Sequence, residues 1–164
     1  MYFQRMGAYG QVYKPEIKIG QGRIMKTFTT EYRVIYGDSD PFDVVYYGNY
    51  FDLFERGRTE MFRELGLTYR VISEQGIYMP VTETYCKYHK SAIYDDLLLI
   101  ETAMAFLKKA SIRFDCKIYR KNPRTLLAEG YTVHAFVNRN KKIQRVPEEV
   151  VARVKELMDD PAKE

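Results

Sequence analysis

The strongest constraint on the fold is a single long amphipathic segment, residues 48–65, in a chain that is otherwise rich in strand-like patterns. Its apolar positions recur at gaps of four, three, four and four, which places on one helical face the residues Tyr50, Phe54, Gly57, Met61 and Leu65. A helix of this length spans about 27 Å. A glycine within the stripe predicts a close approach of a sheet to the helix, and Gly66 is a natural stop.

Strand-like segments lie on both sides of this helix: residues 26–36, 76–89 (interrupted by Pro80), 97–108, 111–119 and 126–137. The pattern is clearest in residues 111–119, where apolar and polar side chains alternate. Pro147 begins a short terminal helix. Strands segregated from helices predict an α+β fold, with a largely antiparallel sheet that curls around the long helix.

The size of the chain suits one domain with one core. It has 164 residues, of which 46% are hydrophobic and 29% charged. We interpret residues 26–158 as this domain, residues 1–25 as an extension that is partly tag-derived or flexible, and residues 159–164 as a frayed tail. Two cysteines form neither a disulfide framework nor a zinc site. With no apolar run long enough to span a membrane and no signal-peptide pattern, we expect a cytoplasmic protein.

The net charge is +4, with basic residues scattered among acidic ones. This is the pattern of a solvated surface, or of one local basic patch for a phosphorylated ligand. The modest charge disfavours nucleic acid as a partner. His89 and His134 lack metal-ligand spacing, so no metal is expected. His134 is predicted to be a hydrogen-bonded sheet residue, and Cys116 a core residue.

The segment of residues 38–41, Asp-Ser-Asp-Pro, lies between a strand and the helix start. One interpretation is turn chemistry, because these residue types cap backbone amides and fix the chain direction. The other is a functional carboxylate beside the unpaired N–H groups at the positive end of a helix. Those amides could polarise a substrate carbonyl. The residue types alone leave both interpretations open.

Two longer motifs resemble the 4-hydroxybenzoyl-CoA thioesterase family. They are YGDSDPFDVVYYGNY at residues 36–50, continued by FERGRTE at 54–60, and YHKSAIYDDL at 88–97. The resemblance covers residues 26–137. It implies the hotdog fold, a curved antiparallel sheet around one long helix, and hydrolysis of an acyl-CoA thioester without a metal or redox cofactor. It also implies a homodimer or homotetramer with active sites at the subunit interface.

The resemblance assigns the catalytic carboxylate to Asp40, as nucleophile or as general base. It assigns the amide that polarises the thioester to the backbone N–H of Tyr47. Substrate contacts are predicted for side chains around the helix start and for basic residues that suit the CoA phosphates: Tyr46, Asn49, Glu55, Lys90, Lys108 and Lys109. Arg120, Lys121 and Arg124 are further basic candidates. Glu55 is equally consistent with a solvated helix acid, and for each basic candidate taken singly a solvated surface residue is the favoured interpretation.

One departure from the family is Asp43, where relatives usually have Gly. A carboxylate there could strain the turn, act on Asp40 or supply an extra base. Two alternative functions therefore stay open. One is a thioesterase for acyl groups on a carrier protein, and the other is an acyl-CoA binder that Asp43 has made inactive.

Overall fold

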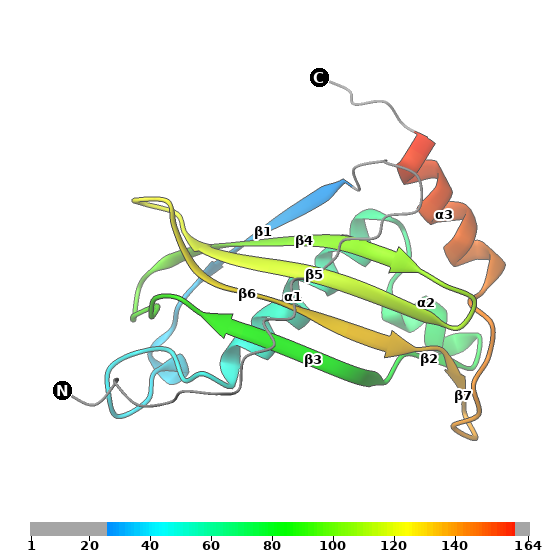
Figure 1. Cartoon of the computed structure of the whole chain (residues 1–164), viewed down its shortest axis with the longest axis horizontal. Helices are drawn as coiled ribbons and strands as arrows, with labels where there is room; N and C mark the ends of the chain where they lie inside the picture. The colour runs from blue at the N-terminus through cyan, green and yellow to red at the C-terminus, as the bar shows by residue number, and fades with distance from the viewer. Residues whose placement is uncertain (1–25, 160–164) are drawn as a thin grey trace, which may run out of the picture.

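A twisted five-stranded antiparallel sheet lies against helix α1 (Asn49–Glu64), which crosses behind it in Figure 1. The computed structural model describes residues 26–159. The strand order is β1-β4-β5-β6-β3, and every neighbouring pair is antiparallel. The sheet strands are β1 (Thr27–Arg33), β3 (Val81–Tyr88), β4 (Leu97–Leu107), β5 (Ser111–Arg120) and β6 (Thr125–Ala135).

Smaller elements gather at one end of the sheet, on the right in Figure 1. The two-stranded β2–β7 ladder and the helices α2 and α3 lie there. Their bounds are β2 (Ile77–Tyr78), β7 (Val137–Asn138), α2 (Tyr69–Glu74) and α3 (Glu148–Asp159). The opposite end carries the loop between β1 and α1, in which a 3-10 turn spans Tyr36–Asp38. This loop holds the motif that the sequence marks as functional.

The core lies between α1 and the inner face of the sheet. Phe54 and Met61 of the helix are fully buried, as the apolar stripe predicts, and Phe62 beside the stripe is fully buried as well. Alternate residues of β5 meet them, because successive side chains of a strand point to opposite faces. The inward residues are at most 2% exposed: Ile112, Phe114, Cys116 and Ile118. The alternation predicted for this strand is therefore confirmed.

Gly57 is the point of closest approach between helix and sheet. A Cβ added there would lie 2.3 Å from Oγ1 of Thr102 and 2.7 Å from Cγ2 of Ile100, both on β4. Carbon atoms do not approach that closely, so the backbone can lie at this depth because the residue has no side chain. The glycine in the helical stripe is thus explained by packing.

Strand β3 forms one edge of the sheet and is the most exposed of its strands. Its free side presents backbone groups that no strand of residues 26–159 pairs with. Val81, Tyr85 and Tyr88 are 52%, 49% and 43% exposed. Long, partly apolar edges of this kind invite pairing with another chain.

The predicted α+β hotdog architecture is confirmed, with one element missed. Helix α2 lies just before the strand predicted at residues 76–89, where no element was predicted; Thr68 caps it by accepting a hydrogen bond from the Val71 N–H at 3.3 Å. Its six residues are too few to establish a helical period. The predictions for residues 1–25 and 160–164 lie outside the described residues. Between residues 26 and 159, no helix combines the length and apolarity needed to cross a membrane.

Candidate active site

The loop that precedes α1 is a tight hairpin. Ser39 and Val45 form an isolated antiparallel bridge, and the Asp40 N–H donates to the Val44 carbonyl at 2.9 Å. Within this hairpin the Asp43 N–H donates to the Asp40 carbonyl at 3.0 Å. These bonds fix the backbone of the hairpin, and with it the position of Asp40.

Asp43 occupies a left-handed backbone conformation, with φ of 59°. Glycine adopts this region without a steric penalty, and aspartate is among the few other residues that tolerate it. The Asp43 side chain is exposed. The turn therefore keeps its hairpin geometry with Asp43 in the place of the usual glycine, at a modest cost in backbone strain.

The Asp40 carboxylate is held by one of its two oxygens. Oδ1 accepts a hydrogen bond from the Phe42 N–H at 2.8 Å. Among the residues that the structure describes, Oδ2 has neither a hydrogen-bond nor an ion-pair partner. Asp40 is half-buried, so this second oxygen is the part of the carboxylate that can meet a ligand.

The start of α1 leaves amides unpaired beside this carboxylate. The Tyr46 N–H donates to the Asp38 carbonyl, and the Asn49 N–H donates to the Tyr46 carbonyl, both at 2.9 Å. Within residues 26–159, the N–H groups of Tyr47 and Gly48 donate no hydrogen bond. The first amides of a helix carry a partial positive charge, so they suit an anion or a developing oxyanion.

Asp40 and Tyr47 line one cavity of about 270 Å³. The cavity lies between the hairpin, the start of α1 and the end of β3, and its lining residues are Asp40, Val44, Val45, Tyr47, Tyr50, Tyr88, His89, Lys90 and Ser91. Asp40 with a free carboxylate oxygen, Tyr47 with an unpaired amide, and Lys90 thus line the same space. This combination can bind a polar carbonyl and activate a nucleophile toward it.

Tyr50 and Tyr88, which the sequence analysis did not select as site residues, also line this cavity. The Tyr50 hydroxyl accepts from the Ala92 N–H at 3.2 Å, and burial raises the pKa of Tyr50. The Tyr88 hydroxyl donates to the Tyr47 carbonyl at 2.9 Å. Their rings meet edge to face with centroids 5.1 Å apart. Tyr88 opens the second family-like motif, but only the fold brings it beside residue 47.

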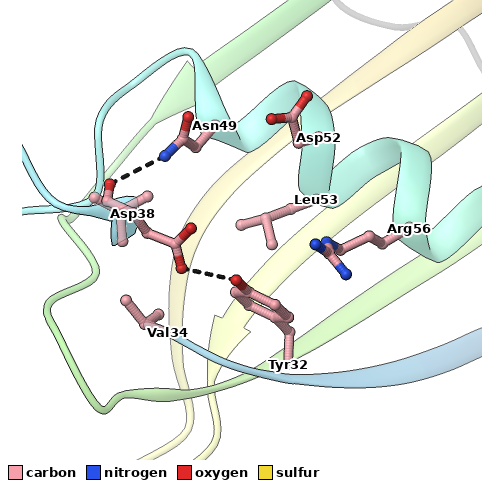
Figure 2. Close-up of a pocket in the computed structure, with 8 residues that line it drawn as sticks. Tyr32, Val34, Asp38, Asn49, Asp52, Leu53 and Arg56 are labelled. Carbon is pink, nitrogen blue, oxygen red and sulfur yellow. Dashed lines mark hydrogen bonds between the residues drawn. The ribbon is translucent and has the colours of Figure 1, made fainter. Parts of the chain in front are cut away.

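Asp38 is a structural residue, and its hydrogen bonds with Tyr32 and Asn49 are drawn in Figure 2. Its Oδ2 accepts from the Tyr32 hydroxyl at 2.8 Å and the Ile35 N–H at 2.9 Å. Its carbonyl accepts from the Asn49 side-chain amide at 3.0 Å. The pocket there has about 40 Å³, space on the scale of one or two waters. Asn49 therefore fastens the hairpin to α1 and borders this pocket, while the cavity of Asp40 lies elsewhere.

An ion pair supports the cavity from the β3–β4 connection. Arg120 donates to both oxygens of Asp96 at 2.9 and 2.8 Å, and to the Ser91 carbonyl at 3.1 Å. Burial raises the pKa of Asp96, but the Arg120 hydrogen bond, the Ile93 N–H and the Arg120 charge outweigh it and hold that pKa below its usual value. The pair anchors the segment that contributes Ser91 to the cavity.

The remaining predicted contacts are spread over the molecule. Tyr46 packs its ring on that of Tyr47, with centroids 4.5 Å apart, and Glu55 is exposed on α1. Lys108 and Lys109 lie in the β4–β5 turn, one strand length (about 33 Å) from the Asp40 end of the sheet. Three other cations are held in ion pairs: Arg120 with Asp96, Lys121 with Glu31 and Arg124 with Glu101. Of the basic candidates, Lys90 lines the cavity.

His134 and Cys116 are structural, as predicted. His134 is 2% exposed and makes hydrogen bonds with the Met79 carbonyl at 2.9 Å and Thr132 Oγ1 at 3.0 Å. Burial, together with the charge of Arg58, lowers the pKa of His134 to about 4. Burial raises the pKa of Cys116 to about 12, so this thiol is inert. Among residues 26–159, no group of three potential metal-ligand side chains comes together; the expectation of a metal-free site stays a prediction.

An antiparallel sheet wrapped around one long helix, with the functional loop at the helix start, defines the class of hotdog-fold proteins. The family model described as the Thioesterase-like superfamily matches residues 34–154, and the chain belongs to this family. It is therefore a thioester hydrolase. The resemblance to the 4-hydroxybenzoyl-CoA thioesterases is confirmed at the level of family and fold.

Known proteins resemble this chain both in sequence and in structure. The chain is 36% identical over 107 residues to the acyl-CoA thioesterase YbgC of Haemophilus influenzae, covering 65% of this chain and 76% of the relative. The crystal structure of Slr0204, a 1,4-dihydroxy-2-naphthoyl-CoA thioesterase from Synechocystis, matches with a TM-score of 0.77 and 21% identity, over 83% and 100% of the two chains. A 4-hydroxybenzoyl CoA thioesterase mutant in complex with 4-hydroxybenzoyl CoA matches with a TM-score of 0.70 and 24% identity, over 81% and 99%.

Proposed function

We propose that the protein hydrolyses the thioester of acyl-CoA, with Asp40 as the carboxylate that acts on the thioester carbon. Acyl-CoA as the substrate class is supported by the relatives named for that activity. The observation that carries the mechanism is the shared cavity, which is lined both by Asp40, with its free carboxylate oxygen, and by Tyr47, with its unpaired amide. A nucleophile or base next to an oxyanion-binding amide is the arrangement that acyl transfer requires.

In the general-base route, Asp40 takes a proton from water as the water oxygen attacks the carbonyl carbon. The carbonyl oxygen becomes negative, and the Tyr47 N–H stabilises that charge. The carbon–sulfur bond then breaks, and the CoA thiolate leaves and receives the proton from Asp40. In the nucleophilic route Asp40 attacks directly, the thiolate leaves, and water cleaves the resulting anhydride. Water is the co-reactant in both, and no metal or redox cofactor is part of the proposal.

We further propose that a second copy of the chain completes the site. The cavity in one chain is below the roughly 300–1,000 Å³ typical of ligand sites. Aromatic side chains around it are unusually exposed: Phe42 at 86%, Tyr47 at 62% and Tyr88 at 43%. The unpaired edge of β3 lies beside them and offers a strand for isologous pairing. Sedimentation equilibrium tests this proposal, because a monomer at all concentrations would contradict it.

Within one chain, Lys90 is the cation best placed for a CoA phosphate, since it lines the cavity. Lys108 and Lys109 lie at the far end of β4, so in this proposal they serve a phosphate only from a neighbouring copy. Lys90→Ala should therefore raise KM, and a comparable rise in Lys108→Ala would mean that a lysine of a neighbouring copy meets the phosphate.

The decisive experiment compares wild type with Asp40→Asn on acetyl-, hexanoyl-, palmitoyl- and benzoyl-CoA, by detection of the released thiol. We expect Asn at position 40 to lower kcat at least about 100-fold, a loss of roughly 3 kcal/mol in transition-state stabilisation. Asp43→Asn is the matched control, because it removes an exposed carboxylate from the same hairpin and Asn tolerates the left-handed conformation. Full activity of Asp40→Asn would exclude the mechanism.

Two other outcomes address the alternatives that the sequence leaves open. Faster turnover of acyl groups on an acyl carrier protein than on CoA would make a carrier protein the physiological partner. Binding of all four acyl-CoAs without turnover, by wild type and by Asp43→Gly, would indicate a non-catalytic binder. Turnover that appears only in Asp43→Gly would mean that Asp43 has inactivated an enzyme.

A further inference from the structure

Tyr88 stands where the edge strand meets the helix start. It is the last residue of β3 and lines the cavity that contains Asp40 and Tyr47. Its hydroxyl donates to the Tyr47 carbonyl at 2.9 Å, although 41 residues separate the two in sequence. The mechanism above assigns no task to this hydroxyl.

The Tyr47 carbonyl depends on Tyr88 more than on its own helix. The helical donor to this oxygen, the Tyr50 N–H, lies 3.4 Å away, which is longer than the usual 2.7–3.2 Å of a backbone hydrogen bond. The Tyr88 hydroxyl is 0.5 Å closer (3.4 Å against 2.9 Å). A side chain of the sheet therefore binds the backbone just before α1, where the hydrogen bond from the helix is long.

The two peptide groups that flank Tyr47 are both held. On one side the Asn49 N–H donates to the Tyr46 carbonyl at 2.9 Å, and on the other Tyr88 holds the Tyr47 carbonyl. The Tyr47 N–H shares a peptide plane with the Tyr46 carbonyl, and the Tyr47 carbonyl shares one with the Gly48 N–H, so the two bonds together fix the backbone on both sides of the Tyr47 Cα before any ligand arrives. A pre-set donor stabilises a developing charge without a reorganisation cost.

The environment of Tyr88 keeps its hydroxyl protonated and therefore able to donate. Burial, and then the hydrogen bond with Cys86, raise the pKa of Tyr88, so its hydroxyl keeps its proton throughout the neutral range. The edge-to-face contact with Tyr50 fixes the ring. The ring contact does not depend on the hydroxyl, so a phenylalanine can keep the ring in place while removing the hydrogen bond to Tyr47.

We propose that Tyr88 is a positioning residue: by holding the Tyr47 carbonyl it keeps Tyr47 in place, so that the amide of this residue meets the oxygen of the thioester carbonyl. The inference rests on the proposed function, since it needs that amide to bind the developing oxyanion. It makes the edge strand part of the catalytic apparatus, through one hydroxyl that touches the backbone at residue 47. Tyr88 takes no part in proton transfer.

Tyr88→Phe tests the proposal, with Tyr85→Phe as the matched control. Tyr85 lies three residues earlier on β3, on the opposite face of the strand, and loses a hydroxyl in the same way. We expect Tyr88→Phe to lower kcat roughly 5- to 50-fold, with KM within about twofold of wild type and an unchanged pH profile. Tyr85→Phe should retain the wild-type kcat. Thermal unfolding of both variants checks that the fold is intact.

A second measurement does not require turnover. An acyl-CoA analogue with a methylene in place of the sulfur keeps the carbonyl oxygen, whereas a thioether analogue lacks it. Tyr88→Phe should weaken binding of the ketone analogue several-fold and leave the thioether analogue unaffected. Equal effects on both analogues would overturn the positioning role, and so would a wild-type kcat or a rise in KM alone. Failure of the proposed function is distinguishable, because it appears in wild type as absence of thiol release.

Discussion

The aspartates of residues 38–43 carry the same functional group in three different environments. Both hydrogen bonds at the Asp38 side chain are internal, so its carboxylate joins β1 to the loop that follows it, while its carbonyl is bound to α1 through Asn49. Asp40 uses one oxygen for the turn and keeps the other available, while Asp43 is exposed and accepts a left-handed backbone. Among them, Asp40 alone combines an available oxygen with a place on the cavity wall.

The backbone of Asp43 leads to a stability prediction. We expect Asp43→Val to destabilise the protein by about 1–2 kcal/mol relative to Asp43→Gly, because a β-branched side chain is poorly accommodated at a φ of 59°. Urea unfolding of the two variants measures the difference. Phe42→Val, at the exposed neighbouring position with negative φ, is the control and should change the free energy of unfolding by less than about 0.5 kcal/mol.

At the scale of elements, local sequence patterns were sufficient to predict α1 and the five sheet strands, because each is long enough to display its period. Helix α2 was missed since six residues show less than two turns. In the site, Asp40 and Tyr47 lie in one continuous motif and were predicted from it. Tyr50 and Tyr88 acquire their roles through contacts with residues about 40 positions away, which no local pattern reports.

The contact between α1 and β4 can be tested at Gly57. Alanine is the better helix former by about 1 kcal/mol, yet its Cβ would overlap Thr102 and Ile100. We therefore expect Gly57→Ala to lower the free energy of unfolding by about 1–3 kcal/mol. The double variant with Thr102→Ala should recover part of this loss, as removal of the closest atom predicts. A more stable Gly57→Ala protein would contradict the close packing.

At the scale of the whole molecule, the polar groups of the interior make stability depend on pH. His134 is buried and neutral, and its pKa of about 4 in the folded state is below the ordinary value of 6.5. The unfolded chain therefore binds a proton more readily than the folded one as pH falls from about 6.5 toward 4. The contribution of neutral His134 to the free energy of unfolding is therefore fully present above pH 6.5 and is lost as the pH falls from about 6.5 to about 4. The lowered pKa of Asp96 acts in a separate window, below about pH 4.

We expect wild type to lose roughly 3 kcal/mol more than His134→Gln between pH 7 and pH 4, because glutamine does not titrate. Denaturant unfolding at several pH values gives the slope for each protein. The comparison concerns the slope, so a uniform loss of stability in the variant does not affect it. Parallel curves for the two proteins would mean that His134 is not the source of the pH dependence.

The single hydrogen bond from the Phe42 N–H to Asp40 has a kinetic consequence. It favours one orientation of the carboxylate about its last carbon–carbon bond, with one oxygen toward the Phe42 amide and the other left free. An incoming acyl group or water therefore meets a carboxylate whose orientation is already biased. Part of the torsional freedom that a loose aspartate would surrender on every encounter has been removed once, when the chain folded.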